Sequence, residues 1–152
     1  GLFEVNVMSA FHLIQASAAS MIKGKVAGRI VVIASTAAVK GMRYTAAYSA
    51  SKHAVLGLVR SSALELANKG ITVNALCPGI VGTGMWRGES GLSARWSEKG
   101  ESEPAAWERL QKSLLPQGVA QTPEDMGPLV VYLAQAEHVT GQAIAVDGGF
   151  TL

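Results

Sequence analysis

The alternation of short β-branched apolar runs with longer stretches of helical periodicity constrains the fold of this chain most strongly. Residues 29–35, 71–77 and 141–146 have the composition of strands. The first run has no polar–apolar alternation, which is typical of a parallel strand buried on both faces. Strands that alternate with helices form right-handed βαβ units around a parallel sheet. The sequence therefore predicts an α/β fold with an open parallel sheet of about three strands, flanking helices and an unpaired edge.

Start and stop signals bound the helices between these runs. Apolar residues at spacings of three and four predict a helix over 2–22, and a second helix, rich in small residues, spans 48–68. The lysine and glycine at 69–70 end the second helix as a C-cap. A capping threonine, a proline and two acidic residues begin a third helix over 122–135. We expect the remaining segments to be a turn over 23–28, a loop over 36–47 and a short helix over 103–113.

The composition is unusually apolar for a soluble domain. Hydrophobic residues make up 49% of the chain and charged residues only 16%, where about 25% is ordinary. We therefore expect large faces to be buried against other subunits, or against a surface that is missing from this sequence. The 13 basic and 11 acidic residues are interspersed and give a net charge of +2, so no basic stripe for nucleic acid is expected. The 152 residues suffice for one domain with a core.

The cysteine and histidine content argues against disulfides and metal sites. Cys77 is the only cysteine, so no internal disulfide can form, which favours a reducing, cytoplasmic location. His12, His53 and His138 lack the spacing of metal ligands, and no metal is expected. No apolar run is judged long enough to span a membrane, and the first residues lack the basic region of a signal peptide, so no membrane contact is expected.

The strongest candidates for catalytic residues are Ser35, Tyr48 and Lys52. Tyr48 and Lys52 are four residues apart at a helix start and share a face, and Ser35 ends a parallel strand, where ligands bind in open α/β sheets. Tyrosine has an ordinary pKa near 10, and a nearby ammonium favours its phenolate, which could then act as a base. A serine hydroxyl can hold a substrate oxygen, and a lysine can donate to ribose hydroxyls. Taken alone, each residue is more often an ordinary helix-face contact or loop hydroxyl.

The setting of these residues resembles the short-chain dehydrogenase/reductase family. The matching segments are Val-Val-Ile-Ala-Ser35 and Tyr48-Ser-Ala-Ser-Lys52, and the resemblance extends over residues 1–152. It implies the C-terminal part of a single Rossmann-like domain. It also implies that Tyr48 is the acid/base, that Lys52 lowers the pKa of Tyr48 and binds ribose, and that Ser35 orients the substrate oxygen.

Further motifs of this family occur along the chain. Asn6 resembles the family's helix asparagine, which kinks the helix and holds a water in a proton relay from the lysine. An asparagine inside a helix is more often solvated or bonded locally, and that alternative stays open. Asn74 resembles a residue with a structural role in the sheet. The residues that resemble cofactor contacts, beside Tyr48 and Lys52, are Pro78, Gly79, Ile80 and Thr83.

Residues 80–118 differ from the rest in being rich in Gly, Ser and charge, and they hold all three tryptophans. The resemblance implies that this region covers the substrate, while packing alone would also explain the tryptophans. The stretch Cys77 to Trp86 looks similar to the acetoin, butanediol and polyol reductases of the family, which suggests a small hydroxy-ketone, diol or polyol. Ketoacyl reductases share most of the other motifs and remain an alternative.

The glycine-rich strand–turn–helix with which family members bind the pyrophosphate of NAD or NADP has no counterpart in this chain. We interpret the chain as truncated, beginning within the helix that carries Asn6, and expect it to bind no dinucleotide tightly by itself. The expected activity of the intact protein is NAD(P)-dependent interconversion of a secondary alcohol and a ketone. The alternative is an inactive remnant that serves as an interaction module. Family members form homodimers or homotetramers, here expected through helices 2–22 and 48–68 and the C-terminal strand.

Overall fold

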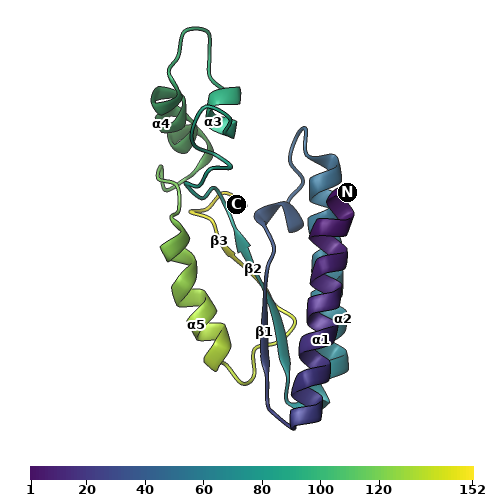
Figure 1. The fold of residues 1–152 in the computed structure, drawn as a ribbon. Helices are drawn as coiled ribbons and strands as arrows, with labels where there is room; N and C mark the ends of the chain where they lie inside the picture. The colour runs from purple at the N-terminus through teal and green to yellow at the C-terminus, as the bar shows by residue number, and fades with distance from the viewer.

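Three parallel strands form one open sheet in the computed structural model, which describes residues 1–152 (Figure 1). The strands are β1 (Arg29–Ile33), β2 (Thr72–Pro78) and β3 (Ala143–Val146), in the order β1-β2-β3. In the register of the sheet, Arg29 lies opposite Thr72 and Ala75 lies opposite Ala143. The predicted open parallel α/β sheet of three strands is confirmed.

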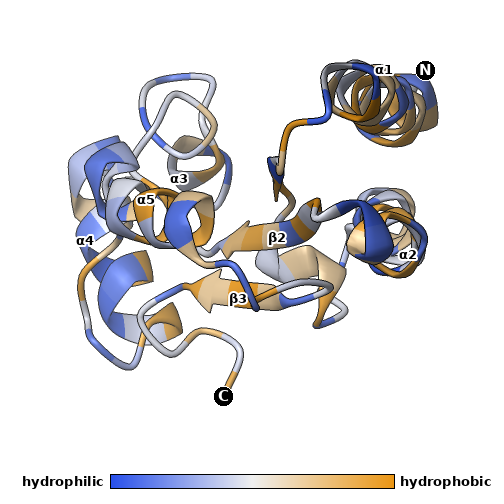
Figure 2. Ribbon diagram, turned by 90° about the horizontal axis from the view of Figure 1, so that it is seen from below, coloured by the Kyte–Doolittle hydropathy of each residue, from blue (hydrophilic) through white to orange (hydrophobic).

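Helices cover the two faces of this sheet. In Figures 1 and 2, α1 (Ser9–Gly24) and α2 (Ala46–Leu66) lie side by side on one face, and α5 (Gly127–Gln135) lies on the other. The first helix begins with a π-helical turn, η1 (Glu4–Met8), and so departs from the regular helix expected over 2–22. The remaining short elements are η2 (Thr36–Ala38), η3 (Ala67–Lys69), α3 (Leu92–Arg95), α4 (Glu103–Leu114) and η4 (Pro123–Met126).

The predicted helix boundaries hold to within a few residues. Gly70 adopts a left-handed conformation with φ of 70° and ends η3, as the C-cap signal indicates. The Thr122 backbone N–H donates to the Asp125 carboxylate at 2.7 Å, which forms a capping box. The helix expected over 122–135 is not uniform, because its first turn is the 3₁₀ turn η4 and the α-helix begins at Gly127.

Burial differs sharply between the central and the edge strands. Every residue of β2 from Thr72 to Cys77 is buried, and this strand packs with Val55, Leu56 and Val59 of α2 in the main core. The expectation that β1 is buried on both faces is wrong, because its first four residues are only half-buried and Ile33 is 55% exposed. The reason is that β1 has no neighbour on its outer side, so that it is the unpaired edge that the sequence predicted.

Residues 80–118, here called the 80–118 segment, form a second small core above the carboxyl end of the sheet (Figure 1). The Trp86 ring lies 5.5 Å from the Trp96 ring and 6.1 Å from the Trp107 ring, centre to centre. The Glu103 carboxylate accepts hydrogen bonds from Arg87 Nε at 2.9 Å and from the Ser93 hydroxyl at 2.6 Å. The tryptophans therefore stabilise the segment by packing on one another.

The surface carries many large apolar side chains, in agreement with the apolar composition. Figure 2 shows apolar residues along α1, and the exposed ones of the first helix include Phe3, Val5 and Leu13. Contrary to the sequence-based expectation, the helical segment Glu4–Gly24 is long and apolar enough to span a membrane, with a mean hydropathy of 1.2. Length and composition alone are weak evidence, because core helices of soluble proteins and N-terminal signal sequences meet the same criteria.

Candidate active site

Ser35 lies where β1 ends and the chain turns into η2. Its side-chain oxygen accepts a hydrogen bond from the Ala37 N–H at 3.1 Å and so caps η2. Because the hydroxyl acts as an acceptor in this bond, its proton remains available for another group. Ser35 thus sits at the carboxyl end of a parallel strand, as its sequence position indicates, with a free donor.

Tyr48 and Lys52 lie on the first turns of α2, which packs against η2. The Lys52 ammonium lies 5.7 Å from the centre of the Tyr48 ring. Burial lowers the pKa of Lys52, and the nearby Cys77 thiol opposes this shift. Neither the phenol of Tyr48 nor the ammonium of Lys52 makes a hydrogen bond within the chain, so both are available to a ligand.

Cys77 lies near the end of β2, close to the Ser35 backbone and to Lys52. Its side chain is fully buried, and the Ser35 backbone and the charge of Lys52 both act on the pKa of its thiol. Burial, the largest effect, raises the pKa of the Cys77 thiol. Lys52, close to the Tyr48 ring, and the backbone of Ser35 therefore both lie near the carboxyl end of the central strand.

Asn6 reaches the same region from the π-helical turn η1. Its side-chain amide donates a hydrogen bond to the Ser51 hydroxyl at 3.0 Å, and the Ser51 hydroxyl donates to the Tyr48 carbonyl at 2.7 Å. Ser51 was not among the candidate site residues expected from the sequence. Its position between Tyr48 and Lys52, on the turn that carries both, was the available signal.

The other four residues expected to contact the cofactor begin with Pro78, the last residue of β2, and continue into the loop that follows it. The Gly79 N–H donates to Val146 on β3 at 3.0 Å, and a Cβ on Gly79 would lie 2.7 Å from the Asp147 Cα. The Ile80 side chain is buried in the second core, so a ligand could reach only its backbone, and no backbone carbonyl of the chain accepts its N–H. Thr83 is exposed, and its hydroxyl makes no hydrogen bond within the chain.

Asn74 has the structural role that the sequence analysis assigned to it. Its side chain is fully buried in β2. The amide donates to the Val139 carbonyl at 2.7 Å, and the amide oxygen accepts from the Gln142 N–H at 3.0 Å. Asn74 thus attaches the chain that enters β3 to the central strand, and it is not available to a ligand.

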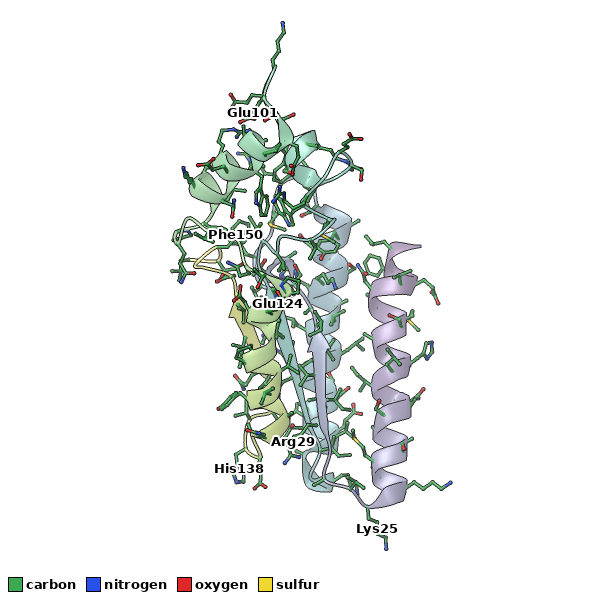
Figure 3. All side chains as sticks on the ribbon, turned by 60° about the vertical axis from the view of Figure 1, so that its left-hand side comes forward. Lys25, Arg29, Glu101, Glu124, His138 and Phe150 are labelled. Carbon is green, nitrogen blue, oxygen red and sulfur yellow. The ribbon has the colours of Figure 1, made fainter.

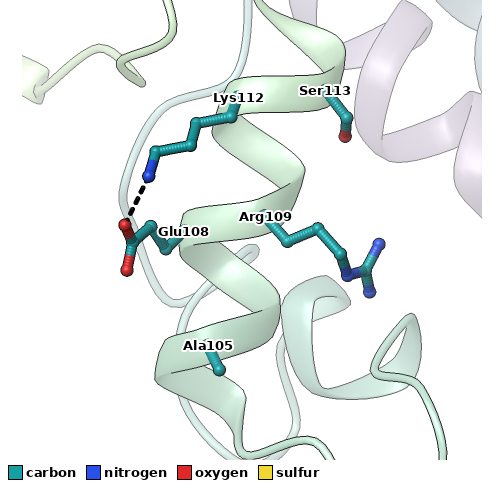
Figure 4. A pocket seen from close by; sticks show the side chains of 5 residues that line it. All are labelled: Ala105, Glu108, Arg109, Lys112 and Ser113. Atoms are coloured by element: carbon teal, nitrogen blue, oxygen red, sulfur yellow. Dashed lines mark hydrogen bonds and ion pairs between the residues drawn. The ribbon is translucent and has the colours of Figure 1, made fainter.

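Figure 4 shows a shallow depression on α4, and none of the residues that line it is a candidate site residue. It is lined by Ala105, Glu108, Arg109, Lys112 and Ser113. Lys112 pairs with Glu108 at 2.6 Å within it, which is the usual pattern of a solvated helix face.

Figure 3 shows the two ends of the sheet, with Arg29 and His138 near its amino end and Phe150 near its carboxyl end. No group of three or more His, Cys, Asp or Glu side chains has the arrangement of a metal site.

Comparison with known proteins adds family evidence to this geometry. The sequence pattern of a family described as enoyl-(acyl carrier protein) reductase matches residues 1–151. L-2,3-butanediol dehydrogenase of Corynebacterium glutamicum is 41% identical over 150 residues, which are 97% of this chain and 57% of that protein. An (S)-acetoin-forming diacetyl reductase of Staphylococcus epidermidis is 38% identical over 97% of this chain and 58% of its own length.

Solved structures of oxidoreductases have the same fold. 4-Hydroxyisoleucine dehydrogenase complexed with NADH superposes with a TM-score of 0.79 at 30% identity, over 98% of this chain and 57% of that chain. ElxO with NADP bound superposes with a TM-score of 0.79 at 30% identity, over 95% of this chain and 54% of that chain. The chain thus spans a little over half the length of the proteins it matches.

Proposed function

Because the chain belongs to the short-chain dehydrogenase/reductase family, we propose that the protein interconverts a secondary alcohol and a ketone with NAD or NADP. The observation that carries this proposal is the Lys52 ammonium 5.7 Å from the centre of the Tyr48 ring, with both groups unpaired and Ser35 just after the neighbouring strand β1. The nicotinamide cofactor supplies the chemistry of hydride transfer when bound. The protein side chains must then bind the oxygen of the substrate and move one proton.

Tyr48 is the acid/base in this proposal. In the reductive direction its phenol gives a proton to the carbonyl oxygen, and in the oxidative direction its phenolate takes the proton of the alcohol. The Lys52 ammonium, 5.7 Å from the ring centre, stabilises the phenolate by charge. Ser35 donates its free hydroxyl proton to the substrate oxygen and orients it. Asn6 holds the water that passes the proton onward from Lys52.

The segment that follows β2 fits the nicotinamide end of a dinucleotide. The free Ile80 N–H and the unpaired Thr83 hydroxyl are suited to the carboxamide and the phosphate side, and Lys52 is suited to the ribose hydroxyls. Pro78 and the closely packed Gly79 fix the direction in which this segment leaves the strand. These contacts serve NAD and NADP equally, because none of them reaches the adenosine ribose.

The substrate that we propose is a small hydroxy-ketone, diketone or diol. Support comes from the butanediol dehydrogenase and diacetyl reductase relatives, each matched over 97% of this chain. A ketoacyl thioester is the alternative, and the enoyl-(acyl carrier protein) reductase description of the matching family supports the acyl-thioester part of it only. The gene product at its full length, assayed with NADH and NADPH, should reduce diacetyl faster than a ketoacyl thioester.

The Tyr48→Phe variant tests the mechanism. The change removes the phenolic proton while the ring stays in place, so turnover should fall by at least about 100-fold, the usual minimum for a general acid. Cofactor binding measured by calorimetry should stay within about twofold of the parent, because the ribose contact of Lys52 is retained. Retained turnover in Tyr48→Phe would remove Tyr48 from this role. A calorimetric titration of the 152-residue chain alone should show no micromolar binding of NADH.

An interaction module formed by α1 and α2 is a second candidate function. The observation that favours it is the apolar surface of the first helix, where Phe3 is 48% and Leu13 is 68% exposed. In this case two copies of the chain pair through the two helices, as a homodimer or within a homotetramer. Sedimentation measures this association, and a full-length gene product that associates but has no reductase activity would favour the module over the enzyme.

A further inference from the structure

We propose that Ser51 is a positioning residue for Tyr48, because its hydroxyl links the Asn6 amide to the backbone turn that carries Tyr48 and Lys52. The role in turnover rests on the proposed function. Ser51 does not touch the phenol or the ammonium. It acts on the place from which both side chains project, through the Tyr48 carbonyl.

Ser51 is fully buried, and its hydroxyl both donates and accepts a hydrogen bond. It accepts from Asn6 Nδ2 at 3.0 Å, donates to the Tyr48 carbonyl at 2.7 Å, and Ser51 has no exposed surface. A serine that bonds back to the carbonyl three residues earlier is a common local pattern in helices. The additional bond from Asn6 is not local, because the two residues are 45 positions apart and belong to different helices.

The π-helical turn η1 explains why Asn6 is placed for this bond. Asn6 is the central residue of η1, and η1 packs directly against α2. Turns of this kind are rare in α-helices and are frequent at functional sites. The irregular turn and the buried hydroxyl therefore form one connection, which fixes the start of α2 against the first helix at the level of Tyr48.

Loss of this connection should displace the Tyr48 turn without removing any group that contacts a ligand. Ser51→Ala leaves the Asn6 amide without its acceptor and frees the Tyr48 carbonyl from one of its donors. Because Tyr48 acts on the reacting oxygen, its misplacement should lower kcat. The KM for the cofactor should change less than kcat, because the Ile80 N–H and the Thr83 hydroxyl are untouched and Lys52, on the same turn, keeps its ammonium.

A double-mutant cycle with Asn6→Ala and Ser51→Ala in the full-length gene product tests the proposal, with diacetyl and NADH as the assayed pair. We expect Ser51→Ala to lower kcat on the order of tenfold and to change KM less than about twofold. The double variant should be no slower than the slower single variant, and the losses in unfolding free energy should be less than additive. Ser61→Ala, an exposed serine of the same helix, is the matched control and should behave as the parent.

Two results would overturn the positioning role. One is a double variant whose losses in unfolding free energy and in the logarithm of kcat equal the sums of the losses in the two single variants. Substitutions of independent residues have additive effects, whereas substitutions of residues that share a hydrogen-bond network do not. The other is an unchanged kcat in Ser51→Ala when Tyr48→Phe is inactive. This result would contradict the positioning role of Ser51 but would still agree with the proposed function. Turnover retained by Tyr48→Phe would instead defeat the proposed function and, with it, this role of Ser51.

Discussion

The Lys52 ammonium lies one helical turn beyond Tyr48 on α2 and 5.7 Å from the centre of its ring, in a site that lowers the pKa of the lysine by burial. A charge held in such a site favours the tyrosine phenolate and disfavours the folded state at the same time. The same residue therefore serves the proposed chemistry and weakens the fold. This conflict makes Lys52 a sensitive point for a test.

Lys52→Met should stabilise the chain and abolish turnover of the full-length protein. Methionine keeps the unbranched stem and removes the half-buried charge, so we expect Tm to rise by roughly 2 °C near neutral pH. A lysine whose pKa is lowered by folding destabilises the fold while it is charged, and this effect disappears as the pH rises through the lowered pKa toward the ordinary value near 10.4. The difference in Tm between Lys52→Met and the parent should accordingly shrink in alkaline buffer. A Tm difference that is constant or grows with pH would contradict this account.

Gly79→Ala should disturb the turn that follows β2. A Cβ at this position would lie 2.7 Å from both the Cα and the Cβ of Asp147, so backbone must move to admit it. We expect the free energy of unfolding, measured with urea, to fall by about 2 kcal/mol. Gly84→Ala is the control, since nothing lies within 4 Å of a Cβ there, and its effect should stay within about 0.5 kcal/mol. Equal effects of the two substitutions would show that the turn is not close-packed.

The sheet could be predicted from the sequence because its strands are encoded by local composition. The central strand β2, Thr72–Pro78, lies within one residue of the run 71–77 that predicted it. The burial of β1 was not predictable in the same way. The run from Ile30 to Ile33 has the composition of a strand with two covered faces, but its exposure depends on which neighbours flank it, and the structure provides a neighbour on one side only.

The candidate site was predictable where its spacing is helical and unpredictable where it depends on tertiary contacts. Tyr48 and Lys52 share a face because four residues make about one turn. The packing of two helices determines the π-helical turn around Asn6 and the contact of Asn6 with Ser51. The local sequence does not indicate how these helices pack. The buried Ile80 side chain is a similar case, since its burial depends on Trp107 and Leu115 of the 80–118 segment.

Acid should loosen the 80–118 segment within a defined range of pH. Hydrogen bonds from Arg109, followed by the Glu98 backbone N–H, lower the pKa of Glu101 from 4.5 to about 2. A carboxyl with a lowered pKa stabilises the fold above its ordinary pKa and loses this contribution as the pH falls toward the lowered value. Arg109 also donates to the Trp96 carbonyl at 2.9 Å, so tryptophan fluorescence should change between pH 4.5 and about 2.

Two variants separate the Glu101 pair from general acid unfolding. Glu101→Gln removes this titrating group, and its fluorescence change within this range should be smaller than that of the parent, with only the part that comes from Glu103, whose pKa Arg87 and Ser93 lower, remaining. Glu98→Gln removes an exposed carboxylate that lies 3.7 Å from Arg109, and the transition should persist. A transition in Glu101→Gln identical to that of the parent would show that another group controls the segment.

Gly57 in the middle of α2 tests whether the helix pair is an association surface. The position is exposed, and nothing lies within 4 Å of where a Cβ would be. Gly57→Ala should therefore raise the free energy of unfolding by about 0.5–1 kcal/mol, the ordinary gain from replacing glycine inside a helix. Gly57→Leu should leave the circular dichroism spectrum unchanged but should lower the sedimenting mass, because the larger side chain would prevent close approach of a second copy. Ala105→Leu, an exposed site on α4, is the matched control and should sediment as the parent. If Gly57→Leu sediments as the parent does, the oligomer forms through another surface.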